Sequence, residues 1–248
     1  MNIPAQGLLS RFGIPLAVFA LLTVAVSGES FWIDEVSTAW LTLPPTLAGF
    51  WQSLGETGSE AQMPVFALYF WCWAKCFGLS EVALRCANLP WILAAVWAMR
   101  VMLVRSGSSP LSLLWMMLPV FPFYMNEARP YIMTAGSAFV ALAAVDALFS
   151  DDEPRSGGKV LWAWLFPLSL LVCVGSSLLN LCLLPALAAY LLVPGPGRTA
   201  EDDEGLKGHI RKLLAAAKRH AVSLGLATGI TVLLALYYAW TLSRGFGG

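Results

Sequence analysis

Two adjacent carboxylates, Asp34 and Glu35, follow an aromatic pair in a strongly apolar chain of 248 residues. They lie in a segment, 29–62, that contains five acidic residues and no Lys or Arg. Carboxylates beside a membrane are costly to desolvate, so they indicate either a functional site or a hydrated loop. A carboxylate against an apolar wall can act as a general base or help to hold a divalent cation.

We therefore take Asp34 as the candidate catalytic base. Glu35 is the second catalytic candidate, and we expect it to orient the loop, because neighbouring side chains of an extended segment point in opposite directions. The alternative is a solvated pair of loop acids, and the spacing alone does not decide between them.

The second candidate cluster is Glu127, Arg129 and Tyr131, between two apolar runs. Pro130 suits the first turn of a helix, so the cluster is expected at a helix start. An Arg beside a Glu and a Tyr can bind a phosphate through two parallel hydrogen bonds. An Arg at a membrane boundary can also be a snorkelling anchor, and both interpretations stay open.

The third candidate pair is Glu60 and Gln62, where the acidic segment meets an apolar run that begins near Pro64. Either side chain can reach a metal ion or a phosphate; the alternative is an ordinary helix start with Pro in its first turn. Asp34 and Glu60 are thus the candidate ligands of a divalent metal ion, the one cofactor that the sequence suggests. A multi-His metal site is not expected, because the chain has only two His.

The composition predicts a multi-pass integral membrane protein. Hydrophobic residues make up 58% of the chain and charged residues 12%, and the mean hydropathy is +0.70. Soluble domains are roughly 45–50% apolar and 25% charged. The expected partner is therefore membrane lipid. Nucleic-acid binding is not expected, because no basic face interleaved with aromatic residues is evident. The five Cys lie in or beside apolar runs and are expected to be free thiols.

Eight apolar runs predict an all-α, polytopic transmembrane bundle with seven or eight membrane segments, in one module that covers residues 1–248. The first run is expected to be an uncleaved anchor rather than a signal peptide, since the rest of the chain is membranous too. A polar break at 175–180 predicts that two short helices meet there. The runs are 12–27, 63–78, 82–104, 110–125, 131–149, 160–175, 178–193 and 221–242.

The segment 29–62 is expected to be the first extracytoplasmic loop, because it has no positive charge to retain it in the cytoplasm. Within 47–54, apolar side chains recur at i, i+3, i+4 and i+7, and Thr46 can cap the helix that this spacing indicates. We predict a short amphipathic helix that lies flat on the outer membrane surface. The alternative is a core helix of a small domain outside the membrane.

The loop 194–220 is expected to be cytoplasmic, because it carries six Lys or Arg against four acids. Within it, 210–219 predicts a basic amphipathic helix near anionic lipid. If every apolar run crossed the membrane, this loop would lie outside, against the positive-inside tendency. If the run 63–78 does not fully cross, or if 63–104 acts as one crossing, the acidic segment and the 127–129 corner converge outside and the basic loop lies inside. We favour the second topology, and the sequence leaves both open.

Four motifs, in this order and at this spacing, resemble the N-terminal half of the GT-C glycosyltransferases that use polyprenyl-phosphate sugars. The group is the dolichyl-phosphate-mannose-protein mannosyltransferase and aminoarabinose-transferase-like family, and the similarity covers about residues 10–195. The motifs are Trp-Ile-Asp-Glu at 32–35, Met-Pro-Val-Phe-Ala-Leu-Tyr-Phe at 63–70, Phe-Gly-Leu-Ser-Glu-Val-Ala-Leu-Arg at 77–85 and Asn-Glu-Ala-Arg-Pro-Tyr at 126–131.

The resemblance implies a glycosyltransferase of a bacterial inner membrane. Such an enzyme moves a sugar from a polyprenyl-phosphate donor to a hydroxyl of an acceptor, here unknown, on the outer face, and it inverts the anomeric centre. It also implies that Asp34 deprotonates the acceptor and that Glu35 supports the site. Glu127, Arg129 and Tyr131 would lie near the donor. A nearby cation or metal ion would stabilise the lipid-phosphate leaving group.

The chain departs from the family pattern in two places. Relatives often have a His or an acid followed by Pro-Pro where this chain has Gln62-Met63-Pro64, and we take Gln62 as a substrate-binding candidate there. Relatives also continue well beyond 248 residues, so we expect a truncated module or a chain that works with a partner subunit. The alternatives to an enzyme are a non-catalytic membrane subunit and a transporter or flippase, although no inverted repeat is visible.

Overall fold

The computed structural model describes residues 30–108, 120–149, 158–192 and 205–245. Within these ranges every regular element is a helix, which agrees with the predicted all-α class. The elements are α2 (Ile33–Leu41), α3 (Leu47–Glu56), η1 (Glu60–Gln62), α4 (Pro64–Phe77), α5 (Glu81–Cys86), α6 (Leu89–Arg105), α7 (Val120–Met125), α8 (Tyr131–Phe149), α9 (Gly158–Ser176), η3 (Leu178–Cys182), α10 (Leu183–Leu192), α11 (Gly205–Arg219) and α12 (Ala221–Gly245), where η marks a 3-10 helix.

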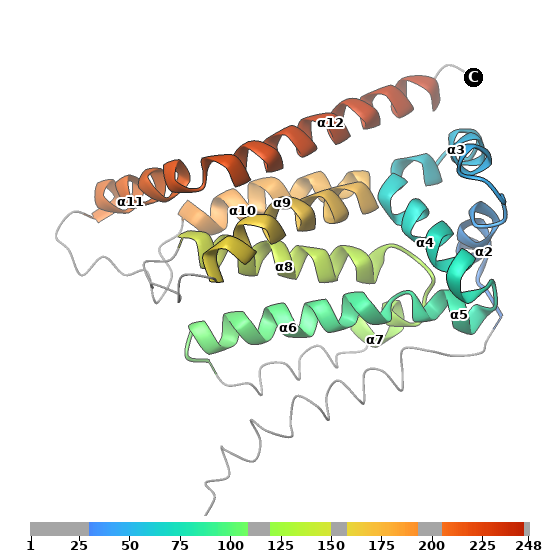
Figure 1. Ribbon diagram of the computed structural model, residues 1–248, viewed down its shortest axis with the longest axis horizontal. Coiled ribbons are helices and arrows are strands. Elements are labelled where there is room, and N and C mark those ends of the chain that lie inside the picture. The colour runs from blue at the N-terminus through green and yellow to red at the C-terminus, as the bar shows by residue number, and fades with distance from the viewer. Residues whose placement is uncertain (1–29, 109–119, 150–157, 193–204, 246–248) are drawn as a thin grey trace, which may run out of the picture.

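Four helical stretches are long and apolar enough to cross a membrane, so the chain has the character of a membrane protein. They are Glu81–Arg105, Tyr131–Phe149, Gly158–Ser176 and Ala221–Arg244. In Figure 1 the long helices run along the long axis of the molecule. Helix α8 packs against both α6 and α9, and α12 packs against α9. The described residues thus hold four candidate spans, fewer than the seven or eight predicted.

Two apolar runs are not among the four candidate spans, because their described helices are short. A span needs roughly 17–25 residues. The run 63–78 becomes α4, with 14 residues, and the run 178–193 becomes the shorter apolar stretch Leu178–Leu192. The run 12–27 and most of the run 110–125 lie outside the described residues.

Helix α4 belongs to a layer of short helices over one end of the bundle. In Figure 1 it lies with α2, α3 and α5 at that end. Trp71 donates a hydrogen bond from Nε1 to the carbonyl oxygen of Pro44 at 2.8 Å, and Lys75 donates from Nζ to that of Thr42 at 3.0 Å. These contacts fasten α4 to the chain between α2 and α3 at this end of the bundle.

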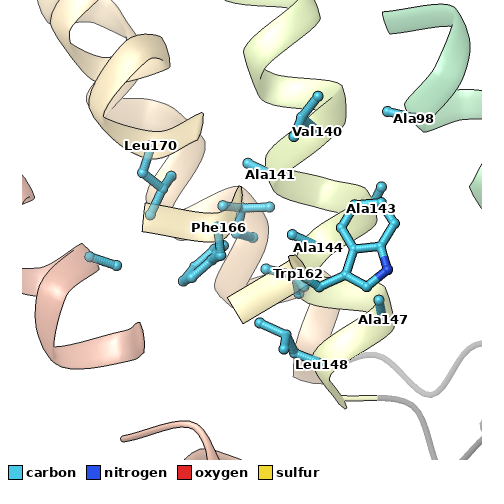
Figure 2. Close-up of a cluster of buried hydrophobic side chains, with 13 residues drawn as sticks. Ala98, Val140, Ala141, Ala143, Ala144, Ala147, Leu148, Trp162, Phe166 and Leu170 are labelled. Atoms are coloured by element: carbon cyan, nitrogen blue, oxygen red, sulfur yellow. The ribbon is translucent and has the colours of Figure 1, made fainter. Parts of the chain in front are cut away.

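Small side chains on α8 let its neighbours approach closely. The buried cluster in Figure 2 joins Ala98 of α6 and the alanines of α8 with Trp162 and Phe166 of α9. Gly136 of α8 has no room for a side chain, because a Cβ there would lie 2.5 Å from the carbonyl oxygen of Trp91. Close packing of small residues is a common way for helices to associate in lipid.

The predicted amphipathic helix in the first loop is present as α3. Thr46 caps this helix, because its hydroxyl oxygen accepts a hydrogen bond from the N–H of Gly49. Phe50 and Leu54 are buried against α4, whereas Trp51 on the same helix is exposed. The helix therefore has one face packed on the protein and leaves aromatic surface open.

The two ends of the bundle differ in charge. We call the end formed by α2 to α5 and the start of α8 the acidic end, because six of the seven acids in the described ranges lie there. The seventh, Asp146, pairs with Arg105 outside this layer. The opposite, basic end contains the ion pair of Arg105 with Asp146, at 2.9 Å, and the Lys and Arg residues of α11. This is the arrangement expected for the topology in which the run 63–78 does not cross.

Candidate functional site

The Glu35 carboxylate joins three segments at the acidic end. Arg85 of α5 donates to both of its oxygens, from Nη2 at 2.9 Å and from Nε at 3.2 Å. The N–H groups of Ala128 and Trp32 add hydrogen bonds of 2.7 and 3.0 Å. Burial raises the pKa of Glu35, but the hydrogen bonds from Arg85, Ala128 and Trp32 outweigh it and hold the pKa below its ordinary value. Glu35 thus acts as a buried anchor.

Asp34 points away from this network. The segment was expected to be extended, but it is helical. Both acids occupy the first turn of α2, and the Glu35 carboxylate accepts a hydrogen bond from the N–H of Trp32. Successive residues of a helix are about 100° apart, so the two side chains diverge as predicted, by a different geometry. Asp34 is exposed and Glu35 is 1% exposed. Asp34 is therefore open to solvent and Glu35 is not.

Arg129 connects the second predicted cluster to the acidic segment. Its Nη1 donates to Glu60 Oε1 at 2.9 Å, to the carbonyl oxygen of Asp34 at 3.1 Å and to Thr38 Oγ1 at 3.3 Å. Burial lowers the pKa of Arg129, but the hydrogen bond and charge of Glu60 outweigh it and raise the pKa overall. Arg129 Nε and Glu60 Oε2 are buried without a hydrogen-bond partner among the described residues. The pair thus keeps one unused donor and one unused acceptor beside Asp34.

Glu127 is partly buried near the same groups. Burial raises its pKa, the negative charge of Glu35 adds to the rise, and the charge of Arg129 opposes it, with a net upward shift. The backbone of this corner is held by Asn88, whose Nδ2 donates to the carbonyl oxygens of Met125 at 3.0 Å and of Glu127 at 2.6 Å. The start of α6 therefore positions the corner that carries Glu127 and Arg129.

The remaining two predicted contacts lie at the edge of this network. Tyr131 begins α8, is 41% exposed, and packs on Tyr124 with ring centroids 4.5 Å apart. Gln62 is half-buried at the end of η1. The η1 turn is also tied to α12, because Tyr237 donates from its hydroxyl to the carbonyl oxygen of Ala61 at 2.9 Å. All of the predicted site residues thus gather at the acidic end. Arg129 contacts Glu60 and the backbone of Asp34 there, and Glu35 accepts from the neighbouring Ala128.

Sequence reasoning missed Arg85 and Asn88 as site residues. No local pattern links them to their partners, since Arg85 is 50 residues from Glu35 and Asn88 is 39 residues from Glu127. A signal was nevertheless present. An Arg or Asn within or beside an apolar run requires a partner once it is buried, so each position was a candidate for a polar network.

A second polar cluster marks the predicted break at 175–180. Asn180 donates from Nδ2 to the hydroxyls of Thr134 at 3.0 Å and Ser176 at 3.2 Å, and to the carbonyl oxygen of Cys173 at 2.6 Å. These bonds satisfy polar groups left open where α9 ends. They also join the end of α9 to the first turn of α8, so the break lies at the acidic end.

The candidate metal ligands do not form a complete site. Asp34 and Glu60 are the two candidates, and Glu60 already uses one oxygen to accept from Arg129. Across the described ranges, no three His, Cys, Asp or Glu side chains gather as a ligand set. Divalent cations such as Ca²⁺ take about six to eight oxygen ligands. The described residues therefore offer two candidate ligands and no complete set, and the Arg129 guanidinium lies beside the backbone of Asp34.

The arrangement can perform two elementary steps. An exposed carboxylate can accept a proton from a substrate hydroxyl, and a fixed guanidinium can bind a phosphate oxyanion. The chain matches no protein-family model, no curated protein and no solved structure, so this geometry and the sequence motifs are the basis for assigning a function.

Proposed function

We propose that the protein is a membrane glycosyltransferase of the GT-C type, or its N-terminal module, that moves a sugar from a polyprenyl-phosphate donor to an acceptor hydroxyl. The observation that carries the proposal is the contact of Arg129 with Glu60 and with the backbone of Asp34. It joins two of the four family-like motifs, 95 residues apart, at one end of a helical bundle with candidate membrane spans.

In the proposed reaction, the Asp34 carboxylate takes the proton of the acceptor hydroxyl as the hydroxyl oxygen attacks C1 of the sugar. The bond between C1 and the phosphate oxygen breaks, and the lipid phosphate leaves with the electron pair. Attack from the side opposite the phosphate inverts the anomeric centre. The role of the protein at the leaving group is to stabilise the negative charge that develops there.

We assign that role to Arg129. A guanidinium held in place stabilises a departing phosphate without reorganising during the reaction. Arg129 is anchored to Glu60 through Nη1, and 13% of its side chain stays exposed, which supports contact of the guanidinium with the donor phosphate. Glu35 and Arg85 are positioning residues, since their buried pair fixes the first turn of α2 against Ala128.

We place the acidic end on the outer face of a bacterial inner membrane. The support is the charge asymmetry, because Lys and Arg favour the cytoplasmic side of a membrane. The basic end carries Arg105 and α11, whereas 30–62 contains no Lys or Arg. A polyprenyl-phosphate donor would lie with its lipid tail against the bundle and its phosphate at the acidic end.

The test is sugar transfer in washed membranes that contain the chain, with a radiolabelled polyprenyl-phosphate sugar as donor. We expect Asp34→Asn to lower the transfer rate by about 10²–10⁴-fold, the usual contribution of a general base. Glu56→Gln is the matched control, because Glu56 is an exposed acid of the same segment whose side chain accepts from Gln52. Equal transfer by Asp34→Asn and the parent would exclude Asp34 as the base. Donor binding by the parent without transfer would indicate a non-catalytic subunit.

A further inference from the structure

Helix α11, at the basic end, is held to the bundle along one face. His209 is buried, and its Nε2 lies 2.9 Å from the carbonyl oxygen of Leu191 at the end of α10. Helical hydrogen bonds continue beyond α11, because the N–H of His220 donates to Ala216 and the N–H of Leu224 donates to His220. Figure 1 shows α11 leading into α12 at this end. The candidate span α12 therefore follows α11 without an intervening loop.

A second side of α11 is exposed and amphipathic. Ile210 is 40% exposed and Leu214 is 59% exposed. Lys218 continues the same four-residue spacing, so these three side chains follow one another along one side of the helix. Lys218 and its neighbour Arg219 are both exposed. An apolar stripe that ends in Lys and Arg is typical of helices that lie at a membrane interface.

The start of α12 sets the level of the bilayer. Val222 is 76% exposed, and Leu226, one turn later, is 42% exposed. In a spanning helix, exposed aliphatic side chains of this kind face lipid, so the hydrocarbon region begins within about one turn of Arg219. Lys218 and Arg219 then lie at the level of the lipid head groups.

From these observations we propose that α11 binds anionic phospholipid head groups of the leaflet at the basic end. Ile210 and Leu214 enter the interfacial region, and Lys218 and Arg219 contact the phosphates. The charges are complementary: the tract 194–220 carries six basic residues, and its four acids all lie at 201–204, far along the sequence from Lys218. This inference is independent of the sugar-transfer reaction, which concerns the acidic end of the bundle.

The experiment uses the full chain in lipid nanodiscs, with a fluorescent label on a single cysteine introduced by Leu214→Cys after the five native cysteines are replaced by alanine. Nanodiscs contain phosphatidylcholine and phosphatidylglycerol, and either lipid carries bromine atoms, which quench nearby fluorophores. The ratio of quenching by the two brominated lipids measures the preference for the anionic head group at this position. We expect quenching by both lipids, a preference for phosphatidylglycerol, and a loss of that preference at high salt.

Substitution of both basic residues (Lys218→Gln with Arg219→Gln) should reduce the preference by up to roughly 30-fold, the product of two charges near an anionic surface. The control is Arg244→Gln, which removes an exposed basic residue from the far end of α12 and should leave the preference unchanged. Absence of quenching by either lipid would overturn the proposal, as would equal quenching by both in the parent chain. Capture of an acidic protein or nucleic acid by α11, with no lipid preference, would point to a different partner and overturn it too. The salt dependence of the parent keeps the test decisive if the double variant does not fold.

Discussion

The substitution Glu35→Gln tests whether the acidic end depends on a buried charge. The carboxylate receives two hydrogen bonds from Arg85 and one each from the N–H groups of Ala128 and Trp32. Gln keeps the shape of the side chain but removes the charge and one acceptor. Arg85, itself 1% exposed, would then be a buried cation without its counter-charge.

Breaking a buried ion pair by removing one partner costs about 3–5 kcal/mol. For a chain of about this size, each kcal/mol lowers the melting temperature by about 2–4 °C. We therefore expect the melting temperature of Glu35→Gln to fall by about 6–20 °C. The measurement is the fraction of purified protein that stays monodisperse in mild detergent after heating, followed by size-exclusion chromatography.

Two comparisons separate the charge from general disruption. Glu56→Gln, the matched exposed change, should stay within about 0.5 kcal/mol of the parent. Replacing both Glu35 and Arg85 by Leu should recover much of the loss, because a well-packed apolar pair often equals a buried ion pair in stability. The reasoning fails if Glu35→Gln and Glu56→Gln melt within about 2 °C of each other.

Three further predictions concern pH, packing and the phosphate site. The pKa of Glu35 is lower in the folded chain than its ordinary value of 4.5. The stability that this group contributes is therefore fully present above pH 4.5, and it is lost as the pH falls through the folded-state pKa. The difference in melting temperature between the parent and Glu35→Gln should thus be constant at about pH 6–8 and shrink in acid. A difference that stays constant down to about pH 3 would contradict the lowered pKa of Glu35. Gly136→Ala should cost about 1–3 kcal/mol, since its Cβ would lie 2.5 Å from the Trp91 carbonyl oxygen. Gly225→Ala, with no atom within 4 Å of its Cβ, should be neutral or stabilising in the same heating assay. Arg129→Lys keeps the charge but loses the planar donor fork, so donor-dependent transfer should fall about tenfold or more, and unchanged kinetics would remove Arg129 from the phosphate site.

Local features of the sequence predicted local structure well. The cap at Thr46 and the apolar spacing over 47–54 were sufficient for α3, because both signals act within a few residues. The polar break at 175–180 likewise marked the end of α9, where Asn180 now satisfies the exposed polar groups. Hydropathy was less reliable for counting spans. It does not register that Trp71 and Lys75 of α4 bond to the neighbouring loop and keep α4 at one end.

The candidate site could be predicted in its residues but not in its contacts. Acids in a base-free segment and an Arg at a helix start are visible as unusual residues in an apolar chain. That Arg129 reaches Glu60 and the Asp34 carbonyl follows only from the contact of the chain before α8 with α2 and η1. Arg85 ends the family-like motif at 77–85, but its role could not be predicted, because its partner lies 50 residues away.

The most direct measurement determines which side of the membrane each end of the bundle occupies. The five native cysteines are first replaced by alanine, and each variant then receives one new cysteine. The positions are Ser59 or Tyr131 at the acidic end and Ser106 or Lys218 at the basic end, and all four are exposed. Intact cells are treated with a maleimide that does not cross membranes. We expect labelling at 59 and 131 in intact cells, and labelling at 106 and 218 only after the membrane is permeabilised. If positions 59 and 131 label from opposite sides, the acidic segment and the Arg129 corner do not share a site, and the proposed pocket for a lipid-linked sugar does not exist.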